Sequence, residues 1–124
     1  MTTVVDSSVV LTWLQDEAGA DDAEGHLMDG VIGAANWSEV LQKARQHGVD
    51  AELVARLLTS FGIEVADVVE ADGRSAAALW RTGSPLSLGD RLCLALGLRL
   101  GVPVATGDTA WADAAGGPEI ILIR

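Results

Sequence analysis

The stretch TTVVDSSVVLTWL, residues 2–14, contains the unit from which the whole fold is predicted. Thr2 to Val5 is a short run rich in β-branched side chains, which favours a buried strand. Asp6 ends this run, and Ser7 to Leu14 has the pattern of a helix with one of its two leading serines as the cap. The stretch therefore predicts a strand that leads directly into a helix.

The same alternation of strand and helix continues along the chain. The predicted strands are apolar throughout, which is typical of a parallel sheet covered by helices on both faces. We therefore predict an α/β fold, with a central, mostly parallel sheet of about five strands flanked by helices. Further strands are expected at 31–35, 63–65, 102–106 and 119–123, and further helices at 18–28, 36–47, 50–61, 70–82, 88–100 and 108–115.

The bulk composition fits one folded domain that spans residues 1–124. Hydrophobic residues make up 49% of the chain, which argues against disorder. Cys93 is the single cysteine, so no internal disulfide can form, as suits a reducing cytoplasm. The first residues include neither a basic residue nor a long apolar run, so we expect no signal peptide and no membrane association. The expected location is the cytoplasm.

The net charge argues against nucleic acid as a partner. It is −10, with an isoelectric point near 4.3, whereas most nucleic-acid-binding proteins present a basic face to the phosphates. Three features soften this argument. Bound divalent cations would offset clustered acids, several acids are concentrated within residues 16–29, and arginines can hold phosphate through two hydrogen bonds.

Four acidic residues are predicted to meet at one edge of the sheet. Asp6 follows the first strand and Asp108 the fourth, while Glu39 and Asp90 lie in the first turns of two helices. Ligands of open α/β sheets bind beyond the carboxyl ends of the strands, which is this edge. Each acid also has an ordinary explanation as a helix cap, and residues 36–39 and 87–90 both fit capping boxes.

Carboxylates gathered in this way repel one another unless a cation compensates them. Hard oxygen ligands select Mg²⁺ or Mn²⁺, and these ions support phosphodiester hydrolysis without histidine or cysteine. We expect Asp6 and Asp90 to be direct ligands and Asp108 to complete the site. Glu39 is expected to position or deprotonate water. Asp113 is a further candidate ligand, but it lies on a different helical face from Asp108 and is expected to be a surface acid.

Four motifs follow one another along the chain. They are Val-Val-Asp-Ser-Ser at 4–8, Asn-Trp-Ser-Glu-Val at 36–40, Leu-Ser-Leu-Gly-Asp-Arg-Leu-Cys-Leu-Ala-Leu-Gly at 86–97, and Ala-Thr-Gly-Asp-Thr-Ala-Trp at 105–111. Together these motifs resemble PIN-domain ribonucleases and, more narrowly, VapC-type toxins of prokaryotic toxin–antitoxin pairs. The resemblance runs from Val4 to the last predicted strand.

The resemblance implies a single PIN-like domain with the activity of a Mg²⁺- or Mn²⁺-dependent endoribonuclease. The expected substrate is structured RNA such as tRNA or rRNA. It also implies a homodimer and a growth-arresting toxin that a cognate antitoxin protein neutralises by covering the site. Gly89 departs from the family, which more often has alanine there. The acids of the family correspond to Asp6, Glu39, Asp90 and Asp108, and its supporting hydroxyls to Ser7 and Thr106.

Three other functions are alternatives to a nuclease. A receiver-type phosphoacceptor needs a lysine after a late strand, but the only lysine, Lys43, lies within a predicted helix. A phosphatase with an Asp-x-Asp motif is disfavoured because serines follow Asp6. A non-catalytic binding module with the PIN fold stays open, although the complete set of acids argues against it. Arg91 is a candidate for contact with phosphate or for a surface salt bridge, and Cys93 is expected in the core.

Overall fold

The computed structural model describes residues 2–114 and 116–123, apart from the side chain of Asp113. The strands and helices follow one another in the predicted order, with two helices after each of the first three strands. No helix of the described residues is long and apolar enough to cross a membrane. The strands are β1 (Val4–Val5), β2 (Val31–Gly33), β3 (Glu64–Ala66), β4 (Val104–Thr106) and β5 (Ile120–Leu122). The helices are α1 (Ser7–Leu14), α2 (Ala20–Leu27), α3 (Ala34–Gln46), α4 (Ala51–Ser60), α5 (Glu70–Ala78), α6 (Leu88–Leu100) and the 3₁₀ helix η1 (Thr109–Asp113).

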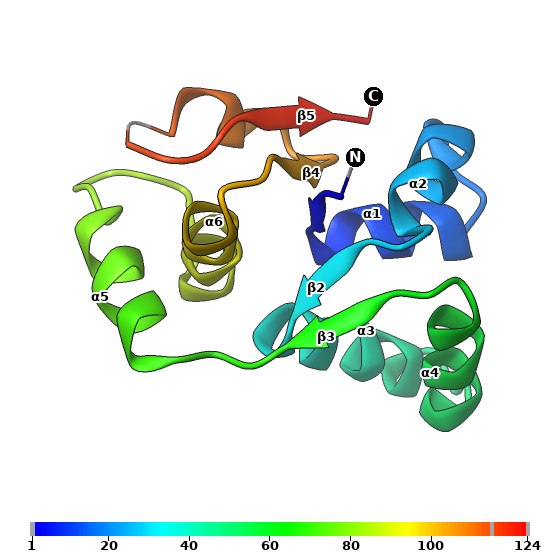
Figure 1. Ribbon diagram of the computed structural model, residues 1–124. Coiled ribbons are helices and arrows are strands. Elements are labelled where there is room, and N and C mark those ends of the chain that lie inside the picture. Colours follow the sequence, from blue (N-terminus) through cyan, green and yellow to red (C-terminus); the bar gives the residue numbers. More distant parts are fainter. Residues whose placement is uncertain (1, 115, 124) are drawn as a thin grey trace.

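The five strands form one sheet in the order β3-β2-β1-β4-β5, from the bottom to the top of Figure 1. Every pair of neighbours is parallel. The central strand β1 aligns Val4 with Val31 on one side and with Val104 on the other. The predicted α/β class with a parallel sheet of about five strands is therefore confirmed.

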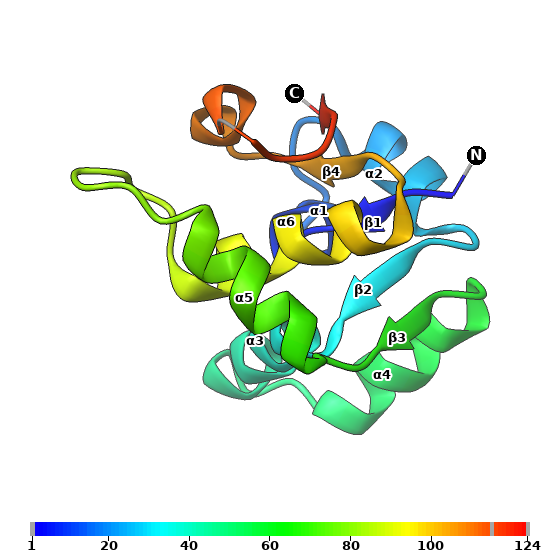
Figure 2. The same cartoon turned by 60° about the vertical axis from the view of Figure 1, so that its left-hand side comes forward.

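Helices cover both faces of the sheet. Helices α5 and α6 lie on one side of the sheet, and α1 to α4 lie on the other (Figures 1 and 2). Successive strand residues point to opposite faces, so Val4 joins the core beneath α6 while Val5 joins the core beneath α1 to α4. Both faces are buried, and this explains why the central strands are apolar without alternation.

Two helices have the predicted bounds, and other boundaries differ by a few residues. Helices α1 and α6 match the prediction, and α6 ends at Gly101 with a left-handed φ of 68°. Helix α3 begins at Ala34, two residues before the predicted start, and Gly33 is its N-cap residue. Helix α5 stops at Ala78, and the chain leaves it with Trp80 exposed.

An ion pair fastens α5 to α6. The Arg99 guanidinium donates from Nε to Oδ1 of Asp72 at 2.9 Å and from Nη2 to Oδ2 at 3.2 Å. The Asp72 side chain is 4% exposed and also accepts a hydrogen bond from the backbone N–H of Val69. Arg99 is the cation that compensates this buried carboxylate.

Replacing Arg99 by alanine is expected to destabilise the protein by about 2 kcal/mol, because a buried carboxylate loses its charged partner. The matched control is Arg74→Ala, which removes the exposed ion pair with Glu70, whose side chain is 76% exposed. The control is expected to cost less than about 0.5 kcal/mol. Urea unfolding of both variants measures the difference, and equal losses would contradict the structural role of Asp72.

Candidate functional site

Asp6 lies where β1 ends and α1 begins. It occupies the N-cap position of α1 and is only 4% exposed. Its side chain makes no capping bond to the helix, and three hydroxyl groups donate to it instead. Oδ2 accepts from Ser8 at 2.7 Å and from Thr106 at 3.0 Å, and Oδ1 accepts from Ser7 at 3.4 Å. The prediction that a serine caps α1 was wrong, because Asp6 holds that position.

The turn after β4 fixes two of the three hydroxyl groups around Asp6. The backbone N–H of Gly107 donates to Oγ of Ser8 at 2.9 Å, and that of Asp108 donates to Oγ1 of Thr106 at 3.1 Å. The hydroxyl oxygens of Ser8 and Thr106 thus accept from the backbone, and each hydroxyl can donate its own proton to the carboxylate. Ser8 was not predicted as a supporting residue, although its hydroxyl contact with Asp6 is shorter than that of Ser7.

Glu39 projects from the second turn of α3. Its Oε1 accepts a hydrogen bond from Nδ2 of Asn36 at 2.9 Å. The capping box predicted over residues 36–39 was wrong, because α3 already begins at Ala34 and Asn36 lies inside the helix. Asn36 is 1% exposed, and the sequence prediction missed it as a site residue because the pattern assigned it to capping.

Asp90 belongs to the first turn of α6, where the predicted capping box is confirmed. Its backbone N–H donates to Oγ of Ser87 at 3.1 Å, and its Oδ2 accepts from the backbone N–H of Ser87 at 3.0 Å. One carboxylate oxygen of Asp90 is therefore engaged in the cap. The other, Oδ1, accepts no hydrogen bond from the described residues.

Asp108 follows β4 at the predicted edge of the sheet, but it is exposed. Its Oδ1 accepts from the backbone N–H of Ala110 at 2.9 Å and so caps η1. The ordinary role of a cap therefore accounts for one oxygen of this acid. The side chain of Asp113, the further candidate, lies outside the described residues.

The negative charges of Glu39 and Asp90 lie close enough to Asp6 to change its pKa. Burial raises the pKa of Asp6 above its ordinary value near 3.8; the hydroxyls of Ser8 and Thr106 oppose the rise, and the charges of Asp90 and Glu39 add to it. Burial also raises the pKa of the Cys93 thiol, with smaller contributions from the same three carboxylates. Cys93 is fully buried, as predicted, in the core beneath α6.

The structure thus brings Asp6, Glu39 and Asp90 within electrostatic reach of one another, with Asp108 at the same edge. Within residues 2–114 and 116–123, no three or more Asp, Glu, His or Cys side chains are grouped so that they could hold a metal ion as they stand. The donor set nevertheless suits a hard cation. Oε2 of Glu39 and Oδ1 of Asp90 are carboxylate oxygens, the ligand type that Mg²⁺ and Mn²⁺ prefer, and neither accepts a hydrogen bond from the described residues.

Arg91 follows Asp90 but points to a neighbouring helix. Its Nη1 donates to the backbone carbonyl of Ala76 in α5 at 2.9 Å. Its buried Nε has no hydrogen-bond partner among the described residues. The contact joins α6 to α5 and involves no carboxylate, so Arg91 does not form the surface salt bridge that was one of its two predicted roles.

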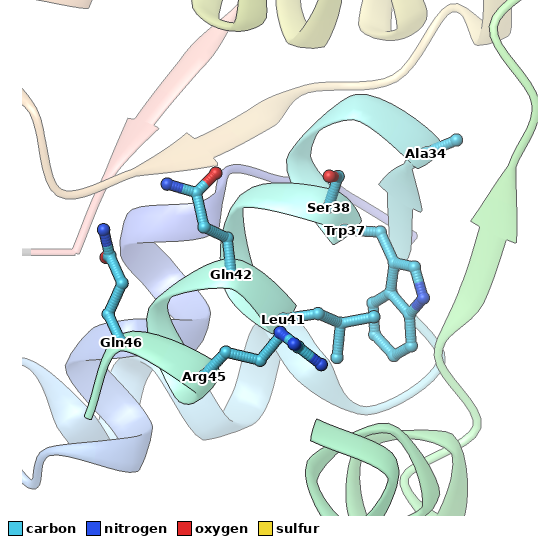
Figure 3. A pocket seen from close by; sticks show the side chains of 7 residues that line it. All are labelled: Ala34, Trp37, Ser38, Leu41, Gln42, Arg45 and Gln46. Carbon is cyan, nitrogen blue, oxygen red and sulfur yellow. The ribbon is translucent and has the colours of Figure 1, made fainter. Parts of the chain in front are cut away.

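A shallow hollow of about 620 Å³ lies on the outer side of α3 (Figure 3). Trp37 and Leu41 form its apolar floor, and Arg45 borders it one turn further along the helix. None of the four predicted acids lines it, because Glu39 lies on another face of the same helix. The hollow is therefore separate from the acids.

The comparisons with known proteins agree with this geometry. No curated protein matches the sequence. The chain is similar to a toxin–antitoxin complex from Klebsiella pneumoniae, at 20% identity over 98% of both chains and a TM-score of 0.77. It is also similar to VapBC2 of Rickettsia felis bound to a DNA fragment from its promoter, at 11% identity over 98% of both chains and a TM-score of 0.75.

A third similar structure is VapC20 of Mycobacterium tuberculosis, a toxin that cleaves the sarcin–ricin loop. The identity is 17%, over 96% of this chain and 98% of that one, with a TM-score of 0.73. At such identities the likeness establishes a shared fold. The sequence model of the PIN domain matches residues 3–117, which is nearly the whole chain. The protein therefore belongs to the PIN domain family.

Proposed function

We propose that the protein is a metal-dependent endoribonuclease. The observation that carries this proposal is the environment of Asp6. A carboxylate that is 4% exposed is held by three hydroxyl groups and feels the charges of Glu39 and Asp90. Such an arrangement is costly for a protein without a cation, so stability alone does not account for it.

We assign the metal ligands, and the residue that positions and deprotonates the attacking water, as follows. Asp6 and Asp90 would hold Mg²⁺ or Mn²⁺ directly, Asp108 would complete the site, and Ser7, Ser8 and Thr106 would orient the Asp6 carboxylate. The ion would supply stabilisation of the phosphate charge and a more acidic water. Glu39, whose Oε2 accepts no hydrogen bond from the described residues, would position that water and accept its proton.

We propose structured RNA, such as tRNA or rRNA, as the substrate. This assignment is supported by the similarity to a Mycobacterium tuberculosis toxin that cleaves the sarcin–ricin loop. A net charge of −10 makes the approach of a polyanion unfavourable. A cation held among the acids would lower that barrier at the place where the phosphate must bind.

We further propose that the protein acts in the cytoplasm as the toxin of a toxin–antitoxin pair and forms a homodimer. The similar structure from Klebsiella pneumoniae is a toxin–antitoxin complex, which supports an antitoxin protein as partner. An antitoxin would neutralise the enzyme by covering the acids at the sheet edge.

Induced expression in a bacterial host tests this proposal. Wild-type protein is expected to arrest growth and to produce new RNA ends, which sequencing of 5′ ends maps on tRNA or rRNA. The matched control is Asp90→Asn, which keeps the size of the side chain and is expected to produce neither effect. Growth arrest by the Asp90→Asn variant, or wild-type expression without new RNA ends, would favour a non-catalytic binding module with the PIN fold.

A further inference from the structure

Asn36 bridges two helices that are far apart in the sequence. Its Nδ2 donates to Oε1 of Glu39 within α3 at 2.9 Å and to the backbone carbonyl of Gly89 in α6 at 3.3 Å. The two protons of one amide group can serve both acceptors. Asn36 thus connects the carboxylate of Glu39 to the turn of α6 that carries Asp90.

The buried amide of Asn36 carries a cost as well as two hydrogen bonds. Asn36 lies in the first turn of α3. It is 1% exposed, and its Oδ1 is buried without a hydrogen-bond partner among the described residues. An alanine would avoid this cost, but it would lose both hydrogen bonds that Nδ2 donates. The donor on Nδ2 is therefore the feature that distinguishes asparagine from alanine here.

The carboxylate of Glu39 lies against the backbone of α6. A Cβ added at Gly89 would stand 3.2 Å from Oε1 and 3.5 Å from Oε2 of Glu39, so the two helices meet closely here. Without a donor, a glutamate side chain has several rotatable bonds and can swing into solvent. The Asn36 amide limits this freedom and holds the carboxylate beside Gly89, one residue before Asp90.

We infer that Asn36 is a positioning residue that fixes the Glu39 carboxylate relative to Asp90. This inference rests on the proposed function, in which Glu39 handles the attacking water. Asn36 does not touch substrate; it acts through Glu39. Because a misplacement of about 1 Å in such a group costs up to about a hundredfold in rate, the bridge has a measurable effect.

The first test measures the contact without any activity. Asn36 is the only asparagine in the chain. When asparagine and glutamine are labelled with ¹⁵N, the spectrum of the metal-free protein therefore contains one asparagine side-chain NH₂ pair, which belongs to Asn36. Its protons are expected to exchange with solvent about tenfold or more slowly than those of the exposed glutamines, because they are buried and bonded. Glu39→Ala is expected to shift this pair and speed its exchange, whereas the exposed control Glu52→Ala leaves it unchanged.

The second test is a double-mutant cycle on RNA cleavage. Asn36→Ala is expected to lower kcat about tenfold to a hundredfold with little change in KM. In a Glu39→Gln background the same change is expected to have almost no further effect, because the group it positions is gone. Asn36→Asp, which loses the donor but not the shape, is expected to lower kcat as well, and thermal unfolding checks that each variant folds.

The outcomes separate the inference from the function on which it rests. Equal losses of kcat in the wild-type and Glu39→Gln backgrounds would overturn the positioning role while leaving the nuclease intact. A wild-type protein without cleavage would overturn the proposed nuclease. In that case, exchange of the Asn36 amide at the rate of exposed glutamines, or insensitivity to Glu39→Ala, would overturn the bridge itself, and slow, Glu39-dependent exchange would support it.

Discussion

Asp6→Asn is expected to lower the rate of RNA cleavage by about a thousandfold or more while leaving the fold intact. Asparagine has the shape of aspartate and still offers one oxygen to the hydroxyls of Ser8 and Thr106. It carries no charge, however, and is a much weaker ligand for Mg²⁺ or Mn²⁺ than a carboxylate. Single-turnover cleavage of an RNA that the wild type cuts, with Mn²⁺ present, measures the loss.

The control for this prediction is Asp50→Asn. Asp50 is an exposed acid that caps α4 by accepting from the backbone N–H of Glu52 at 3.0 Å. The change removes one negative charge from a residue that is not one of the four acids. Cleavage is therefore expected to stay within about twofold of the wild type. Cleavage by Asp6→Asn at a tenth or more of the wild-type rate would contradict the role of Asp6 as a ligand.

The same substitution is expected to stabilise the metal-free protein. Asp6 is a buried carboxylate near two like charges, and burial, Asp90 and Glu39 all raise its pKa. Replacing it with a neutral group removes the cost of burying that charge at neutral pH. Loss of activity together with a higher melting temperature is the signature of a residue retained for function at a cost in stability.

The positions of three acids at the sheet edge could be predicted from the sequence. Asp6 and Asp108 follow strands that are recognisable as short apolar runs, and the parallel sheet brings the ends of those strands to one edge. Asp90 was also placed correctly, because the capping box with Ser87 is a local pattern of four residues. Local patterns and topology were therefore sufficient to place three of the four acids.

The surroundings of Glu39 could not be predicted in the same way. A second capping-box pattern over residues 36–39 is not a cap in the structure, because α3 starts two residues earlier. The partner of Asn36 in α6 is 53 residues away in the sequence, and a pattern of neighbouring residues contains no sign of it. The choice between Ser7 and Ser8 beside Asp6 likewise depends on the turn after β4, which contacts Ser8.

Asp108 shows how an acid can be placed correctly and still have an ordinary role. It lies at the predicted edge, but its Oδ1 caps η1, and the charges that raise the pKa of Asp6 come from Asp90 and Glu39. Proximity to the sheet edge is a consequence of topology, whereas the shared electrostatics of Asp6, Glu39 and Asp90 depend on how α3 and α6 pack. This difference supports ranking Asp6 and Asp90 ahead of Asp108 as ligands.

The second large effect expected is a pH-dependent stabilisation by metal. In the metal-free protein the pKa of Asp6 is raised above 3.8, so the native state binds more protons than the unfolded state as the pH rises from that value. The contribution of Asp6 to the free energy of unfolding therefore falls as the pH rises from the pKa of Asp6 in the unfolded state to its pKa in the folded state. Above the folded-state pKa the loss is complete. The difference between wild type and Asp6→Asn isolates this contribution, because Asp6 is the one carboxylate that the two proteins do not share.

A divalent cation favours the charged form of Asp6 and is expected to reverse that loss. At neutral pH, Mn²⁺ at about a hundred times its dissociation constant stabilises the native state by about 3 kcal/mol, which corresponds to a rise of about 10 °C in melting temperature. Towards acid pH, protons compete with the ion for the Asp6 carboxylate, and the rise is expected to shrink. Thermal unfolding with Mn²⁺ or EDTA at several pH values measures it. An equal rise in Asp6→Asn would place the ion at a site that does not include Asp6. A rise that grows towards acid pH would contradict a site built from carboxylates, because carboxylates must lose their protons to bind the ion.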